Sequence, residues 1–216
     1  MTDAPDLAEV HAAHQEHRGR HWHERLMMLC DGVFAISITL LGVEITVPAA
    51  NVATLQGIWA ALAPQLDAYA LSFVVISVYW LAHRRFTTLV RHADAPMTVL
   101  TLVTLGLVAL LPAATRLAHS PPARLVYSAL VVAIGASLAA TWGYAALIAD
   151  LIPAHIRHWQ RWYYLALMLL TPPFFLALTM AVPNAAPGVI PLILLILFLI
   201  GWRLRLRVIR RFGGLS

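Results

Sequence analysis

The chain is dominated by long apolar runs that are separated by charged or turn-forming residues. Each run is long enough, or nearly so, to cross a hydrocarbon core of roughly 30 Å as a helix that rises about 1.5 Å per residue. The runs are continuous rather than alternating, which disfavours the strands of a membrane β-barrel. The sequence therefore predicts an all-α integral membrane protein with six transmembrane helices per chain, at about 26–47, 66–82, 97–115, 123–149, 162–182 and 187–202.

Composition supports this class. Of the 216 residues, 61% are hydrophobic and only 12% are charged, whereas a soluble domain carries roughly 25% charged residues. Segment 52–64 is either a separate helix outside the membrane or an early start of the second span. The single cysteine, Cys30, excludes an internal disulfide.

The arginines predict the orientation of the chain in the membrane. There is no lysine among the 15 basic residues, and every arginine except Arg116 and Arg124 falls in a terminal tail or in the loops after the second and fourth runs. Because cytoplasmic segments are enriched in Arg and Lys, both termini are expected in the cytoplasm, with the chain in the cell (inner) membrane. Arginines at the ends of apolar runs are explained by topology, so nucleic-acid binding is not expected.

Three segments follow from this organisation. Residues 25–202 form the six-helix transmembrane domain, and residues 203–216 form an Arg-rich cytoplasmic tail. Residues 1–24 are too polar for a secretory signal and form a His-rich cytoplasmic tail. The spacing of its histidines would suit metal binding or pH sensing, but a flexible solvated tail is the preferred interpretation; these histidines are His11, His14, His17, His21 and His23.

The first apolar run carries charges at or near membrane depth, at Arg25, Asp31 and Glu44. A carboxylate in hydrocarbon costs about 3 kcal/mol or more, so a partner or a function is expected. Asp31 is six residues from Arg25 and cannot pair with it on one helix, so its partner should come from another helix or another subunit. A solvated position at the start of the helix is the alternative.

One face of the first run has the spacing of a packing seam. At about 100° per residue, its members fall within roughly 60° of Ile36. A seam of this kind can pack like helices together or line an axis, although ordinary packing of a spanning helix would give the same spacing. The seam consists of Arg25, Leu29, Gly32, Ile36, Thr39, Leu40 and Val43.

The same stretch resembles the first-helix signature of the transmembrane protein 175 family, whose members are potassium channels of lysosomes and bacteria. The family pattern Arg-x-x-x-Phe-Ser-Asp is present as Arg25, Leu29, Cys30 and Asp31, with Leu and Cys in place of Phe and Ser. YWLAHRRF (79–86) and LLPAATR (110–116) resemble later parts of the family pattern. The resemblance covers nearly the whole chain.

The resemblance implies a homotetramer in which four first helices surround a pore. Ile36, Leu40 and Val43 would form apolar rings, and Thr39 would supply hydroxyls at the same level. The chain has no TVGYG-like segment, so a hydrophobic constriction would replace a carbonyl filter. The expected function is a channel for K⁺ with modest selectivity over Na⁺. Other monovalent cations, and also protons, are further candidates for permeation.

The resemblance also implies a structural clamp made by Arg25, Asp31, Trp80 and His83. We expect Asp31 to accept a hydrogen bond from His83 or from an arginine of a neighbouring helix. The implied partners are K⁺, further copies of the chain and the lipid bilayer, without a cofactor or metal.

A proton-coupled secondary transporter is the alternative function. It would call for inverted repeats and a midplane ionisable residue, whereas the charges here lie near the ends of the spans. An enzyme is not expected, because no nucleophile–base pair or paired metal ligands stand out at membrane depth.

Overall fold

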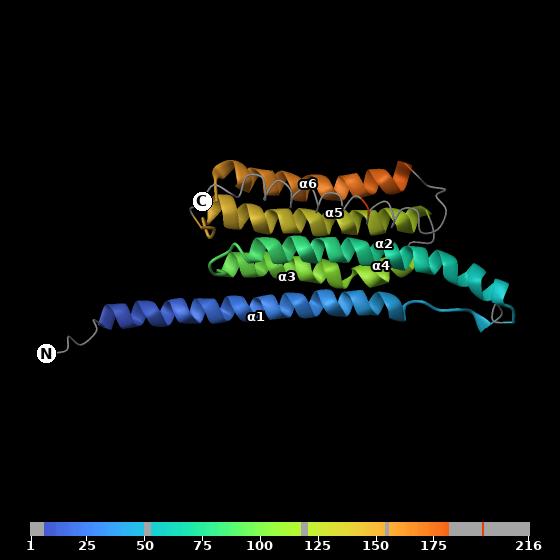
Figure 1. The fold of residues 1–216 in the computed structure, drawn as a ribbon, viewed down its shortest axis with the longest axis horizontal. Helices are drawn as coiled ribbons and strands as arrows, with labels where there is room; N and C mark the ends of the chain where they lie inside the picture. Colours follow the sequence, from blue (N-terminus) through green and yellow to red (C-terminus); the bar gives the residue numbers. More distant parts are fainter. Residues whose placement is uncertain (1–6, 50–52, 118–120, 154–155, 182–195, 197–216) are drawn as a thin grey trace.

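The computed structural model describes residues 7–49, 53–117, 121–153, 156–181 and 196. This part of the chain is built from helices that lie nearly parallel to one another (Figure 1). In chain order these are α1 (Leu7–Val43), α2 (Leu55–Thr87), α3 (Ala95–Ala109), α4 (Leu111–Leu117), α5 (Pro121–Gly143), a π-helical turn (Tyr144–Ile148) and α6 (His158–Ala181).

The first four predicted spans are confirmed as helices that are long and apolar enough to cross a membrane. They are His21–Val43, Leu55–Thr87, Ala95–Leu117 and Arg124–Ile148. The fifth predicted span coincides with α6. Apart from Ile196, the predicted sixth span and the Arg-rich tail lie outside the described residues, so six membrane crossings and cytoplasmic termini remain predictions.

The first two helices are longer than predicted. α1 already begins at Leu7, so the described part of the His-rich segment is helical and continuous with the first span, where the sequence favoured a flexible tail. At about 1.5 Å per residue its 37 residues measure about 55 Å. The helix therefore extends well beyond the bundle at its N-terminal end (Figure 1).

α2 begins at Leu55, so segment 52–64 starts the second span early rather than forming a helix of its own. The start is fixed locally, because the Thr54 hydroxyl accepts a hydrogen bond of 3.0 Å from the Gly57 amide. The third predicted span is divided into α3 and α4 at Leu110. Pro112 lies just beyond this break and cannot donate a backbone hydrogen bond to the preceding turn.

The helices form three layers (Figure 1). α1 makes up one outer layer, α2, α3 and α4 form the middle, and α5 and α6 form the other outer layer. Hydroxyl groups connect the helices inside the bundle: Ser72 on α2 lies 2.8 Å from the Thr115 hydroxyl on α4 and 3.1 Å from the Tyr127 hydroxyl on α5. Such bonds between helices are typical of membrane bundles, where apolar contact alone gives little specificity.

α5 and α6 lie close together at Gly135. A methyl group added at this position would overlap the ring of Pro172 and would come within 3.1 Å of the Tyr79 hydroxyl. Tyr79 itself is held in place, because its hydroxyl donates a 2.8 Å hydrogen bond to the Val131 carbonyl. The small residue is therefore required by the packing of these helices.

We expect Gly135→Ala to lower the free energy of unfolding by about 1–3 kcal/mol, because a well-packed interior tolerates added volume poorly. Thermal unfolding of the purified protein in detergent measures the change. Gly106→Ala on α3 is the matched control: it adds the same methyl group where nothing lies within 4 Å. An equal response of the two variants would contradict this account.

Candidate functional site

One face of α1 packs against the rest of the bundle. Cys30 and Phe34 are each 1% exposed, and Leu41 is 2% exposed. Leu26 and Ser37 complete this buried face, and its spacing of three and four residues is that of a helix packed along one side. The neighbours of α1 are α2, α3 and α4.

The predicted seam lies on a different face, whose large apolar side chains are exposed in the described structure. Ile36 is 59% exposed and Val43 is 74% exposed, while Leu29 and Leu40 are about half exposed. Arg25 and Thr39 are exposed as well, and Gly32 is half-buried. All seven residues that the sequence places on one face are therefore available to lipid or to another copy of the chain.

Thr39 is the polar member of this face in its outer half. Its hydroxyl donates a 2.8 Å hydrogen bond to the Ile36 carbonyl one turn earlier. The proton is thereby directed back to the helix, and the oxygen lone pairs remain able to accept from water or to face a cation. Thr39 can therefore act as an acceptor on an otherwise apolar surface.

Asp31 is bonded to Trp80 rather than to His83 or to an arginine of a neighbouring helix. The indole Nε1 of Trp80 donates a 2.7 Å hydrogen bond to Oδ1 of Asp31. The Arg84 guanidinium stacks over the same indole ring, 5.3 Å from its centroid, which is a favourable cation–π geometry. Asp31 thus belongs to a polar contact between α1 and α2.

His83 does not make the expected bond because its ring lies deeper in the bundle. It is 2% exposed and contacts the rings of Phe34 and Phe86, with centroid distances of 5.8 Å and 5.1 Å. The His83 ring therefore packs into the core beside α1. Trp80, which lies about one helical turn before His83 on α2, donates the hydrogen bond to Asp31 instead.

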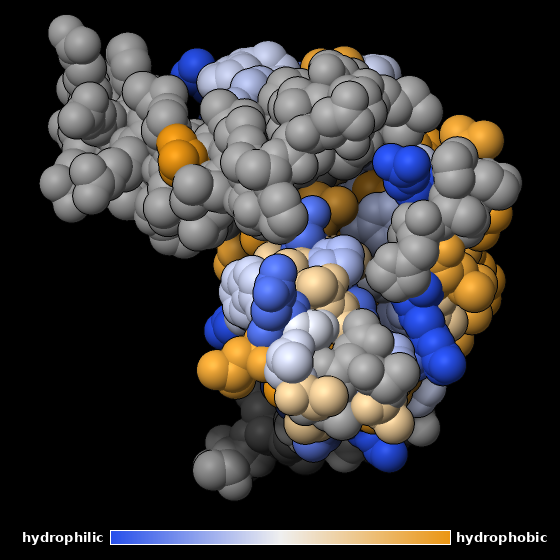
Figure 2. Space-filling view, turned by 90° about the vertical axis from the view of Figure 1, so that its right-hand side faces the viewer, coloured by the Kyte–Doolittle hydropathy of each residue, from blue (hydrophilic) through white to orange (hydrophobic). Residues whose placement is uncertain are grey.

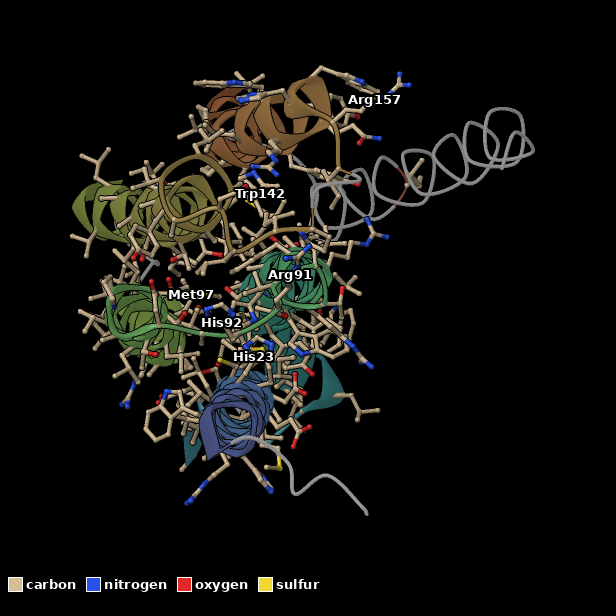
Figure 3. All side chains as sticks on the ribbon, turned by 90° about the vertical axis from the view of Figure 1, so that its left-hand side faces the viewer. His23, Arg91, His92, Met97, Trp142 and Arg157 are labelled. Carbon is tan, nitrogen blue, oxygen red and sulfur yellow. The ribbon has the colours of Figure 1, made fainter. Side chains whose placement is uncertain are left out.

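A small cavity of about 160 Å³ lies between the middle of α1 and the C-terminal end of α2. Viewed from this end of the bundle, His23 projects from α1 toward α2 (Figure 3). Within the described part of the chain, His23 Nδ1 and His83 Nε2 are buried without a hydrogen-bond partner, so the cavity offers polar atoms that water could satisfy. It is lined by His23, Met27, Asp31, His83, Arg84, Thr87 and Thr88.

Three of the four predicted clamp residues thus come together beside the middle of α1. Asp31 and His83 line the cavity, and Trp80 bonds to Asp31. Arg25 is absent from the lining and lies on the exposed seam instead. Among the described His, Cys, Asp and Glu side chains, no group of three or more is placed to hold a metal ion.

The sequence analysis missed two contacts at the C-terminal end of α1. Glu44 Oε2 lies 3.2 Å from Nη1 of Arg116, and the Gln65 amide exchanges hydrogen bonds of 2.9 Å and 2.7 Å with the backbone of Thr46. Arg116 was identifiable as one of only two arginines predicted on the outer side. The early start of α2 places Gln65 beside Thr46, and no sequence motif clearly indicated that start.

We expect Trp80→Phe to reduce stability by about 1 kcal/mol or more, because it removes the indole N–H that donates to Asp31 and leaves the carboxylate without this donor. The matched control is Trp59→Phe, the same substitution on the same helix at a side chain that is 65% exposed. Thermal unfolding in detergent gives both values. A larger loss at Trp59 than at Trp80 would contradict the assigned role of this bond.

Comparison with known proteins agrees with these observations. Residues 25–112 match the family model of the endosomal/lysosomal potassium channel TMEM175. A potassium channel of Streptomyces collinus is 36% identical over 129 residues, which span 55% of this chain and 62% of that protein. A potassium channel of Chamaesiphon minutus is 33% identical over 156 residues, which span 68% of this chain and 70% of that protein.

The fold is also similar to a solved structure. This is the crystal structure of a homolog, from Chamaesiphon minutus, of the lysosomal potassium-selective channel TMEM175. The similarity has a TM-score of 0.63 at 26% sequence identity, and it covers 86% of this chain and 98% of that one. The Arg25–Asp31 signature, the helical membrane fold and these relatives agree, and the chain belongs to the TMEM175 family.

Proposed function

We propose that this chain forms a potassium-permeable channel in which four copies place α1 around a central pore. The observation that carries the proposal is the division of α1 into a packed face and an open apolar face, with Phe34 1% exposed and Ile36 59% exposed. The names of the bacterial relatives, both potassium channels, support the same activity. Such a chain transports ions and is not an enzyme.

The constriction would be made by Ile36, Leu40 and Val43, which follow one another along the open face. A narrow ring of apolar side chains holds water poorly, so a permeating ion must lose part of its hydration shell. K⁺ binds its water less tightly than Na⁺ does. A constriction of this kind would therefore favour K⁺ modestly, without a filter of backbone carbonyls.

The contact between Asp31 and Trp80 would set the rotation of α1. The 2.7 Å bond lies at the edge of the buried face, and it would keep Ile36 and its neighbours turned away from the chain's own core. Arg25 lies on the open face, so in a tetramer it would complete the clamp from the side of a neighbouring copy.

The orientation and location are part of the proposal. The distribution of the arginines supports cytoplasmic termini, and the four confirmed spans support a multi-pass protein of the cell membrane. In this orientation the N-terminal end of α1 faces the cytoplasm and Val43 faces the outer side.

Recording from the purified chain in planar bilayers under a K⁺ gradient tests the proposal. We expect ohmic single-channel currents that reverse near the K⁺ equilibrium potential. We also expect Ile36→Asn to raise the conductance at least about two-fold, because a polar ring admits water more readily than an apolar one. Leu102→Asn on α3 is the control, since it alters an exposed leucine on a helix outside the proposed pore.

Saturable flux that depends on a proton gradient would contradict the proposal and would identify a proton-coupled secondary transporter. A conductance change in Leu102→Asn as large as that in Ile36→Asn would contradict the choice of α1 as the pore helix.

Thr39→Val tests the source of selectivity. Valine keeps the shape of the side chain but removes the oxygen that could replace part of an ion's water shell. We expect the permeability ratio of K⁺ to Na⁺ to fall by about two-fold or more, with K⁺ current preserved. Reversal potentials under bi-ionic conditions measure the ratio, and Thr39→Ser, which keeps the hydroxyl, should retain the original value.

A further inference from the structure

The charged pair at the outer end of α1 has no place in the function proposed so far. Glu44 follows directly after the last residue of the helix, and Arg116 lies in the last turn of α4. Their side chains are 3.2 Å apart. The end-on view from this side shows hydrophilic residues gathered on the end of the bundle, with hydrophobic residues along its flank (Figure 2).

Helix stability does not account for Glu44. A carboxylate next to the C-terminus of a helix is disfavoured by the helix dipole, whereas an arginine in the last turn is favoured. The pair is also partly open to solvent, because the side chains of Glu44 and Arg116 are 32% and 68% exposed. Exposed ion pairs contribute little to folding.

The pair is not needed as the main attachment of this segment either. The Gln65 side chain both donates to the Thr46 carbonyl and accepts from its amide. These two bonds fix the chain to α2 two residues after Glu44. The acidic side chain is therefore free to serve a role that depends on its charge.

The position of Glu44 suggests that role. It directly follows Val43, the outermost member of the open face, whose side chain is 74% exposed. If four copies of α1 surround a pore, four Glu44 carboxylates surround its outer mouth, each with an Arg116 guanidinium behind it. Rings of charged side chains at a pore entrance change the local concentration of permeating ions.

We propose that Glu44 and Arg116 act as opposing charges that set the supply of monovalent cations to the outer mouth of the channel. Glu44 attracts cations, and Arg116 limits that attraction. This inference rests on the proposed function, because it needs α1 to line the pore. It goes beyond that function by assigning conductance control to two residues outside the constriction.

The sign of the conductance change in variants of the two residues distinguishes an electrostatic role from a mechanical one. If the pair controls ion supply, then Glu44→Gln should lower the conductance and Arg116→Gln should raise it. The double variant should return close to the original value. If the pair only ties α1 to α4, both single variants break the same tie and should change the conductance in the same direction.

The experiment is single-channel recording of the full chain and its variants in symmetrical KCl. At about 20 mM KCl, where screening extends over some 20 Å, we expect at least a two-fold decrease for Glu44→Gln and an increase for Arg116→Gln. At about 1 M KCl, where the screening length is roughly 3 Å, these differences should disappear. Glu44→Asp should behave like the unmodified chain, because it keeps the charge.

Arg124→Gln on α5 is the matched control, since it removes the other arginine predicted on the outer side. It lies in a layer that Figure 1 separates from α1 by the middle helices, and it should leave the conductance at low salt unchanged. Changes of the same sign in Glu44→Gln and Arg116→Gln, or unchanged conductance in both, would overturn this inference alone. Absence of K⁺ current from the unmodified chain would overturn the proposed function and this inference with it.

Discussion

The hydrogen bond between Trp80 and Asp31 joins α1 to α2 beside the face of α1 that packs into the bundle. A helix can bury only one side against its neighbours, and α1 buries the side that carries Cys30, Phe34 and Leu41. Asp31 lies at the edge of that side, where the indole of α2 holds it at 2.7 Å. A turn of the helix by one residue, about 100°, would bring Ile36 into the bundle and expose the core. The buried face and this polar contact together are consistent with an α1 whose Ile36 side points away from the bundle.

The layered arrangement gives α1 its exposed position. The middle layer packs against α1 on one side and α5 on the other, so among the described helices the main neighbours of α1 lie on one side. Membrane helices without an aqueous phase around them associate through shape and a few polar contacts. Here α1 makes such contacts at two levels, through Asp31 to Trp80 and through Glu44 to Arg116, and the stretch between them is mostly apolar.

Much of this architecture was predictable from the sequence, and the reasons for the remainder are physical. Apolar runs predicted six spans, four of which are confirmed, and helical periodicity placed Ile36, Leu40 and Val43 on one face, because both properties are local. The partner of Asp31 was not predictable in this way. Periodicity relates residues on one helix, but it does not show how deeply the side chains of a neighbouring helix lie in the bundle. Only packing shows that His83 lies among aromatic rings while Trp80 meets the carboxylate. The early start of α2 was obscured by polar residues such as Gln56 and Gln65.

α1 continues for 37 residues without a break in its helix. A hydrogen-bonded rod of this kind has no joint at which movement could be absorbed, so torque applied at Leu7 is transmitted to Val43. A partner that binds the protruding N-terminal part of α1 would therefore also turn the far end of the helix, at Val43.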